Sequence, residues 1–465
     1  MVKTILRISL IYLSLLLLAS LIWYKERMLF ADPAFISFEI INNKALVISE
    51  YRYGAFITQV FPLMAVGLGL TLKGILLAYS ASFYLFYLAA ALVITYVFKQ
   101  PRLSILLAIY HLIFVSDVFF WPNNEVHQAC AWMMLSIAAV LYQASQQERR
   151  PVWVYGFILL ATGMAIISHV LIIVPFLFLW MYTAIHYRVV EKKRKMAFAF
   201  SALIVLFFLI RIYLSYASWY DGVKLEGVKN LSFQSITNAL VNDHAMSFLR
   251  LLGSKYVVAL LLFGMGVFSL VEKKKWGLLL ITACFALVYY VLVTLTFSDA
   301  INAFNLFYFE SQWMGLAIIL ASPLVIDMNE KTFPRKFLNY AFIGLILLQK
   351  VWHFYGSEIK FSTRLDRLET MVSQMRTQKV EKAYQFKNVD HDEMMVIWGV
   401  PVETMILSAL ESPENAVTYK IFDQVQPVSA AVDSVYTAFR LVPVSVLNKR
   451  YFGLEDSTVY KEFSE

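Results

Sequence analysis

The stretch Lys192–Leu214, KKRKMAFAFSALIVLFFLIRIYL, decides the fold class of this chain. A block of basic residues is followed at once by an apolar run long enough to cross the hydrocarbon core of a membrane, which takes about 17–25 residues. Because cytoplasmic turns retain Lys and Arg, the stretch predicts a helix that begins at the cytoplasmic face and runs outward. Arg211 is the one charged residue in the apolar run and lies near its outer end.

Basic turns alternate along the chain with turns that contain no Lys or Arg. The basic turns hold Lys3 and Arg7, Lys99 and Arg102, Arg149 and Arg150, Arg188 with Lys192–Lys195, Lys273–Lys275, and Lys331, Arg335 and Lys336. The turns without basic residues are Trp121–Gln128, Ser168–His169 and Phe297–Gln312. The positive-inside rule places the basic turns in the cytoplasm and the others outside. The acids, amides and histidines of these turns therefore face outward.

Eleven apolar stretches of spanning length are predicted. They lie near residues 5–23, 75–98, 103–120, 129–143, 152–168, 170–187, 196–214, 256–271, 277–296, 313–326 and 337–353. With a cytoplasmic N-terminus, the odd number places the chain after about residue 355 outside. Counting Phe56–Leu72 as a further span would move five later basic clusters outside. We therefore predict a juxtamembrane or re-entrant helix there, at the outer interface.

The composition is typical of a membrane protein. Hydrophobic residues make up 60% of the chain and charged residues 15%, against about 45–50% and about 25% in soluble domains. The cytoplasmic turns account for most of the basic clusters behind the net charge of +8, so no nucleic-acid partner is expected. The predicted fold is an α-helical polytopic membrane protein with outer juxtamembrane helices and a small C-terminal α+β soluble domain.

Two parts are predicted along the chain. Residues 1–355 form a transmembrane module with a first outer loop at 24–74 and a second large outer loop at 215–255. Residues 356–465 form the extracytoplasmic domain.

The pattern within the C-terminal domain predicts three elements. Ser362–Met375 has the apolar spacing of an amphipathic helix. Met394–Trp398 and Val417–Phe422 have the composition of buried strands bounded by turn residues.

The first outer loop opens with Glu26–Phe35, ERMLFADPAF, and later reaches Tyr51–Gly54, YRYG. An acidic residue, Asp32, thus lies a few positions past the first span, and the second outer loop, Trp121–Gln128, is short and polar. In this order of elements, over about residues 1–145, the chain resembles the GT-C class of polytopic glycosyltransferases. The resemblance implies transfer of a sugar from a polyprenyl phosphate or pyrophosphate in the membrane lipid to a hydroxyl of a lipid, glycan or protein acceptor.

The resemblance implies that Asp32 is the general base that takes the proton of the acceptor. Glu39 lies two helical turns further on, so we expect it on the same side as a second catalytic carboxylate. The alternative for Asp32 is a helix N-cap, because Asp before Pro is a common helix start. Such an enzyme is expected in a bacterial inner (cytoplasmic) membrane, with the C-terminal domain in the periplasm.

The implied donor carries phosphate, and two cations are candidates to bind it. Arg52 lies between two tyrosines in the first outer loop, where a guanidinium can contact phosphate bidentately. Arg211 lies in an apolar span, where a charged group needs a partner or a water-filled cavity. The alternatives are an interfacial anchor for Arg52, and for Arg211 either an anchor or an ion pair with Asp221.

Four outer residues are candidates for hydrogen bonds to sugar and acceptor: Asn124, Glu125, His127 and His169. The alternative is a polar turn that caps two helices. Glu310, among aromatic residues in the last outer loop, is a candidate for sugar or isoprenoid contact, with an interfacial aromatic belt as the alternative. No tight ligand spacing indicates a metal, so no metal-binding residue is assigned and a divalent cofactor stays an open question.

Two other functions compete with the transferase. A lipid-linked sugar transporter or flippase is commonly built from repeated halves with broken helices, whereas no internal repeat is visible here. A non-catalytic scaffold would use the C-terminal domain to recruit partners to the membrane.

The alternation of basic turns generates a topology prediction. In a variant with Cys130 and Cys284 replaced by serine, a cysteine placed at Lys274 should resist a membrane-impermeant thiol reagent in intact cells. A cysteine placed in the C-terminal domain at Lys449 should react. Reaction in the opposite pattern would overturn both the predicted parity and the GT-C resemblance.

Overall fold

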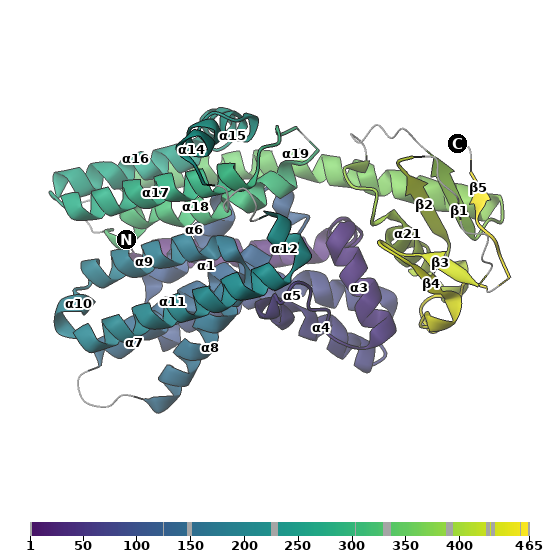
Figure 1. The fold of residues 1–465 in the computed structure, drawn as a ribbon, viewed down its shortest axis with the longest axis horizontal. Helices are drawn as coiled ribbons and strands as arrows, with labels where there is room; N and C mark the ends of the chain where they lie inside the picture. The colour runs from purple at the N-terminus through teal and green to yellow at the C-terminus, as the bar shows by residue number, and fades with distance from the viewer. Residues whose placement is uncertain are drawn as a thin grey trace.

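The computed structural model describes residues 2–123, 125–146, 151–224, 231–302, 304–328, 336–386, 394–424, 428, 433–455 and 457–463. Helices form a bundle, and a small sheet lies at one end of the molecule, far from the N-terminus (Figure 1). The long helix α19 (Lys336–Thr377) runs along the bundle and continues into the sheet-containing part. The helix therefore passes straight through the predicted domain boundary near residue 356.

The bundle is built from helices that follow the predicted apolar stretches, together with the short α10 in the predicted basic turn before residue 196. They are α1 (Val2–Ile22), α5 (Leu72–Leu92, continued by the π-helix Val93–Val97), α6 (Pro101–Ile113), α7 (Glu125–Ser145), α8 (Val152–Ser168), α9 (Ile173–His186), α10 (Val189–Lys192), α11 (Arg194–Ala217), α16 (Val257–Glu272), α17 (Trp276–Thr296) and α18 (Leu306–Ile326). The first outer loop contains α2 (Tyr24–Met28), α3 (Ala31–Asn43) and α4 (Phe56–Gly67). The second contains α12 (Trp219–Lys224), α14 (Phe233–Ala239) and α15 (Asp243–Ser254).

Five helices in the described part of the chain are long and apolar enough to cross a membrane: α1, α5 with its π-helical end, α11, α17 and α18. Two bent helix pairs raise the number to seven if each pair is one span. The protein is therefore a helical membrane protein, but the eleven predicted spans are not confirmed. One reason is that α6 ends at Ile113, well short of the predicted residue 120. Another is that α8 and the helical segment after it meet at 119°.

Helix α18 is the centre of the bundle, since every residue from Leu306 to Ile326 except Tyr308 is buried. It packs against α6, α9, α16 and α17. Helix α1 instead exposes leucine and isoleucine, for example Ile11 and Leu15, on its outer side. An apolar helix that leaves such residues uncovered is suited to contact with lipid.

Two of the predicted cytoplasmic turns contact the C-terminal end of α18. Asp327, after α18, accepts a hydrogen bond from Lys273 at 3.2 Å and one from Lys275. Arg102, the second residue of α6, donates to the carbonyl of Met328 at 2.9 Å. The turn at 147–150 and residues 329–335 lie outside the described part of the chain.

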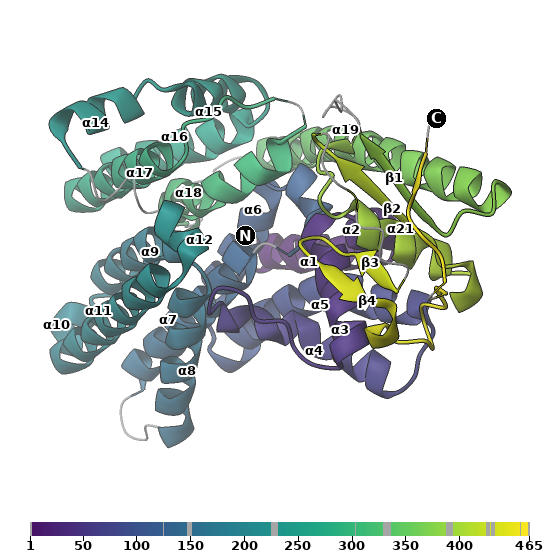
Figure 2. The same ribbon diagram turned by 45° about the vertical axis from the view of Figure 1, so that its right-hand side comes forward.

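The C-terminal part is an α+β unit packed on the outer end of α19. Its main sheet has the parallel order β2 (Thr418–Phe422), β1 (Lys382–Phe386), β5 (Lys461–Glu462), and α21 (Val400–Ala409) packs on β2 and α19. A small antiparallel pair, β3 (Ser434–Tyr436) and β4 (Leu441–Pro443), lies beside it. Figure 2, turned toward this end, places β3 and β4 in front of α3.

The three predicted elements of this unit have different outcomes. The helix at Ser362–Met375 is confirmed as the outer end of α19, and the strand at Val417–Phe422 is confirmed as β2. The strand predicted at Met394–Trp398 is wrong, because this segment is a turn that leads into α21. The carbonyls of Met394 and Val396 accept hydrogen bonds from Arg364 rather than from a neighbouring strand.

Arg364 and Glu403 form a buried ion pair that joins the C-terminal unit to the first outer loop. Their side chains are 2% and 0% exposed, and Arg364 Nη2 lies 2.6 Å from Glu403 Oε2. Arg364 also donates to the carbonyl of Leu29 at 2.9 Å, and Glu403 Oε1 accepts from the backbone N–H of Ala31 at 2.6 Å. Helix α19, helix α21 and the start of α3 are thereby held at one point.

Breaking this pair should destabilise the outer half of the molecule. In Glu403→Ala, the Arg364 guanidinium stays buried without a counter-charge, and loss of one partner of a buried pair costs about 3–5 kcal/mol. The apparent Tm of the purified protein in detergent should fall clearly. The matched control is Glu411→Ala, because Glu411 pairs with Arg376 while 73% exposed, and exposed pairs contribute about 1 kcal/mol at most. An equal Tm for the two variants would contradict this assignment.

Candidate functional site

Asp32 is the second residue of α3, and the C-terminal unit fixes the backbone just before it. Ala31 has a φ of 45°, in the left-handed region that L residues rarely adopt. Its N–H is held by Glu403, and a Cβ built on Gly399 would come within 3.0 Å of the Ala31 Cα. This close approach requires glycine. Phe30 occupies the N-cap position of α3, so the alternative prediction of Asp32 as the N-cap is wrong.

The half-buried carboxylate of Asp32 is oriented by Trp121, whose Nε1 donates to Oδ2 at 2.8 Å. The pKa of Asp32 is raised to about 6. Burial is the main cause and the negative charge of Glu125 adds to it, while the Trp121 hydrogen bond and the positive charge of Arg52 oppose the shift. A carboxylate with this pKa is mostly ionised at neutral pH and is more basic than a solvated Asp.

Four charged side chains from distant segments form a chain of ion pairs, called here the outer charge cluster: Glu125, Arg52, Asp221 and Arg211. Arg52 lies 2.9 Å from both Glu125 Oε2 and Asp221 Oδ1. Arg211 contacts the other oxygen of Asp221 and donates to the carbonyl of Glu50 at 3.0 Å. Two positive and two negative charges leave the cluster neutral. Burial would lower the pKa of Arg52, but the two carboxylates outweigh it and hold the pKa above its usual value.

The loop that carries Arg52 is held against the bundle by Gly54. A Cβ at this position would come within 2.4 Å of the carbonyl oxygen of Met164 and 1.8 Å of Ser168 Oγ, so the loop can approach α8 this closely only with glycine. Trp132 Nε1 donates to the Gly54 carbonyl at 3.3 Å. The position of Arg52 is therefore set by packing on α7 and α8.

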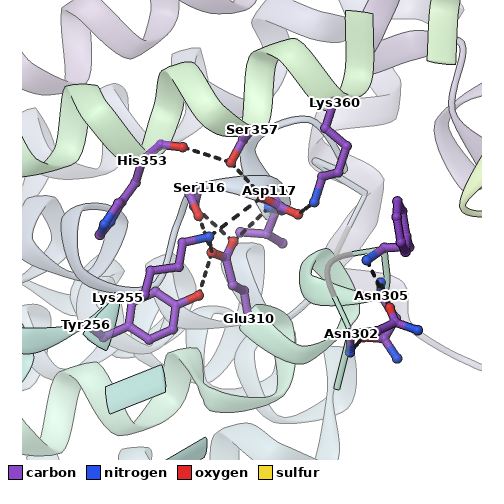
Figure 3. Close-up of polar contacts among 12 residues, drawn as sticks. Ser116, Asp117, Lys255, Tyr256, Asn302, Asn305, Glu310, His353, Ser357 and Lys360 are labelled. Atoms are coloured by element: carbon purple, nitrogen blue, oxygen red, sulfur yellow. Dashed lines mark hydrogen bonds and ion pairs between the residues drawn. The ribbon is translucent and has the colours of Figure 1, made fainter. Parts of the chain in front are cut away.

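Glu310 lies at the outer end of α18 in a second polar cluster (Figure 3). Its Oε2 accepts hydrogen bonds from the backbone N–H groups of Ser116 and Val118, at 2.9 and 3.0 Å. Tyr256 donates its hydroxyl to Oε1 at 2.7 Å, and Lys255 Nζ lies 3.4 Å from the same oxygen. Glu310 is fully buried, and both of its oxygens are used within the protein.

Asp117 lies beside Glu310 and receives donors from α19. Ser357 donates to Oδ1 at 2.5 Å and Lys360 contacts Oδ2, as Figure 3 shows. Lys255 Nζ is 3.8 Å from Oδ1. Asp117, Lys255, Lys360 and Glu310 are called here the Glu310 cluster.

Glu39 has partners other than Asp32. Glu39 lies further along α3, where its Oε2 accepts from Asn43 at 2.7 Å and its Oε1 is 3.7 Å from Arg440 of the C-terminal unit. Asn124 lies outside the described residues.

Two histidines predicted in outer turns lie in structural positions. His127 is buried inside the bundle, where its Nδ1 is 3.2 Å from the Tyr110 hydroxyl and its ring stacks on His111 at 5.5 Å. His169 follows α8, and its Nδ1 accepts from the N–H of Leu171 at 3.2 Å. His169 thus caps the short helix at the bend.

The structure brings Asp32, Glu125, Arg52 and Arg211 into one outer region, as the sequence predicts for a site. Sequence reasoning missed Trp121 and Glu403 as the residues that hold the Asp32 segment, since no local pattern marks a partner from a distant segment. It also missed Lys255 and Lys350. Each of these lysines borders an apolar stretch, and an ionisable residue in such a place is a signal of function that could have identified them.

Among the described residues, no three His, Cys, Asp or Glu side chains come together in a group that could hold a metal ion. No protein-family model, curated protein or solved structure matches this chain.

The ion pairs of the outer charge cluster are expected to contribute to the stability of the protein. Asp221→Asn should lower the apparent Tm more than Arg211→Gln, because loss of Asp221 leaves the buried Arg211 without a carboxylate partner, whereas after Arg211→Gln the Asp221 carboxylate keeps Arg52. Asp299→Asn, at an exposed carboxylate, serves as the control and should leave Tm unchanged. Wild-type stability of Asp221→Asn would show that the ion pairs do not hold the loops together.

Proposed function

We propose that the protein is a membrane glycosyltransferase that acts on the extracytoplasmic face, with Asp32 as general base. The donor is a polyprenyl phosphate or pyrophosphate sugar, and the acceptor is a hydroxyl of a lipid, glycan or protein. The observation that carries the proposal is the Asp32 carboxylate itself. It is half-buried, its pKa is raised to about 6, and it is held in place from two sides by Trp121 and the C-terminal unit.

In the proposed reaction, the acceptor oxygen attacks the anomeric carbon of the donor sugar. The bond between that carbon and the phosphate oxygen breaks, and the phosphate leaves with the electron pair. Asp32 takes the proton that the acceptor hydroxyl loses, which a positioned carboxylate accelerates by about 10²–10⁴-fold. A raised pKa strengthens the base while leaving it ionised at neutral pH, and this suits the proposed role.

The proposed topology follows from the basic turns. The chain crosses a bacterial inner membrane eleven times, with its N-terminus in the cytoplasm and its C-terminal domain in the periplasm. Two observations support this assignment. The N-terminus and the C-terminal sheet lie at opposite ends of the molecule (Figure 1), and two basic turns, those of Lys273–Lys275 and Arg102, contact the C-terminal end of α18 away from the sheet.

The proposed function makes a direct prediction for Asp32→Asn. The amide keeps the size of the side chain but cannot take a proton, so transfer should fall by at least about 10²-fold. For the wild type, activity should fall as the pH drops through about 6, because protonation removes the base. Mass spectrometry of lipid-linked sugars and glycans would identify donor and product in a deletion strain complemented with each variant.

The matched control for this experiment is Asp366→Asn, at an exposed carboxylate on α19. It should support wild-type product levels. Equal membrane levels of the two variants would exclude a folding defect as the cause of lost activity. Near-normal product from Asp32→Asn would refute the proposed base.

A further inference from the structure

A small pocket on the outer side of the bundle lies between α6, α16 and α19. Three of its lining residues are basic: Lys255, Lys350 and His353. The polar side chains of Ser116, Tyr256 and Gln349 line it as well. Part of this lining is visible in Figure 3, where Lys255 extends toward Glu310 below His353 of α19.

Lys350 is the residue of the pocket that most needs a ligand. Its side chain is only 8% exposed. Within the described part of the chain, no hydrogen bond or ion pair engages its ammonium group, whereas Lys255 and Lys360 each contact a carboxylate. The ammonium nitrogen is not fully withdrawn from water, because it borders the pocket, but the rest of the side chain is buried and partial desolvation of an unpaired ammonium group is unfavourable. An anion bound in the pocket would remove this cost.

The charges around the pocket also favour an anion. Lys255, Lys350 and Lys360 supply three positive charges, and Asp117 and Glu310 supply two negative ones. One positive charge is left over even with His353 neutral. The outer charge cluster differs in this respect, since Arg52 and Arg211 are matched by two carboxylates. The surplus charge makes the pocket electrostatically more favourable than that cluster for a phosphate, but its free space of about 20 Å³ holds roughly one water, so its side chains must move apart to admit a phosphate.

An apolar groove on α19 continues from the pocket. It is lined by Leu345, Leu348, Val351, Trp352 and Tyr355, and Gln349 lines both the groove and the pocket. These five side chains follow helical spacing along one face and are 59–73% exposed. A basic pocket that opens into an uncovered apolar groove matches an amphiphile with an anionic head and a hydrocarbon chain.

We propose that the pocket binds the phosphate group of a membrane lipid, with Lys350 as the principal cation and the lipid chain lying along the α19 groove. The proposal rests on the proposed function only for the identity of the lipid, which would then be the phosphate-linked donor. In this proposal the phosphate is bound by Lys350, Lys255 and His353. This is the role that the sequence suggested for Arg52 and Arg211.

The test uses purified full-length protein in detergent micelles and radiolabelled farnesyl phosphate as the probe. Wild-type protein should bind it saturably. Lys350→Met keeps the length of the side chain but removes the charge, and should weaken binding by about tenfold or more, as expected for loss of a charge-assisted contact. The matched control is Lys379→Met, the same change at an exposed lysine just beyond the end of α19 and outside the charge cluster, and it should leave binding unchanged. Equal binding by wild type and Lys350→Met would overturn the proposal.

Two competitors identify the source of the phosphate. Unlabelled farnesyl phosphate should displace the probe, whereas inorganic phosphate and farnesol at the same concentration should not, because each lacks one half of the ligand. Displacement by inorganic phosphate as effective as by farnesyl phosphate would refute the lipid and assign the pocket to free phosphate. Displacement by farnesol would refute the role of the basic pocket.

A second measurement avoids variants that fail to fold. Acetic anhydride labelling of the wild type, read by mass spectrometry, should modify Lys350 less when farnesyl phosphate is present and leave the labelling of Lys360 unchanged. Protection of neither lysine would overturn the proposal.

The proposal for the pocket and the proposal for the reaction can be refuted independently. Binding that depends on Lys350, together with an active Asp32→Asn variant, would refute the transferase mechanism alone. Binding independent of Lys350, together with an inactive Asp32→Asn variant, would refute the pocket alone.

Discussion

The buried ion pair between Arg364 and Glu403 is the contact on which the arrangement of the outer region depends. It lies where α19, α21 and the start of α3 meet, and it uses a guanidinium and a carboxylate that are almost completely withdrawn from water. Such a pair is stable only when further hydrogen bonds satisfy both partners, and here backbone groups at Leu29 and Ala31 supply them. The C-terminal unit therefore acts as a clamp on the residue that precedes Asp32.

The segment between α6 and α7 connects the two polar regions of the outer side. Ser116 and Asp117 at its start belong to the surroundings of Glu310, and Trp121 at its end holds Asp32. The Trp121 ring also contacts Phe307 of α18 at 5.0 Å between ring centres. A displacement at the Glu310 cluster would thus be passed to the proposed base through a short, buried stretch of chain. The segment between α6 and α7 therefore connects the proposed phosphate site to the proposed base.

Several features were predictable from local sequence because they depend on local physics. Apolar runs predicted the helices α1, α11 and α17, since a chain in lipid must satisfy its backbone hydrogen bonds within each segment. An acid just past the first helix drew attention to Asp32. The helical spacing predicted the wrong surroundings for Glu39. Spacing gives the separation of two side chains along a helix, but it does not give the residue that packs against them. For Glu39 that residue is Arg440. The strand predicted at Met394–Trp398 failed for a similar reason, since Arg364 captures its carbonyls.

The sequence by itself determined that this is a helical membrane protein with a small C-terminal α+β unit, because hydrophobicity and turn chemistry are properties of contiguous residues. It also marked Asp32, Arg52, Glu125 and Arg211 as candidates. Only the tertiary structure decided which charges are matched and which are not. Neutralisation of a buried charge depends on partners far away in the sequence, 169 residues for Arg52 and Asp221 and 243 for Lys360 and Asp117. For this reason the unpaired charge of Lys350 can be recognised only in the tertiary structure, where α16, α18 and α19 lie together.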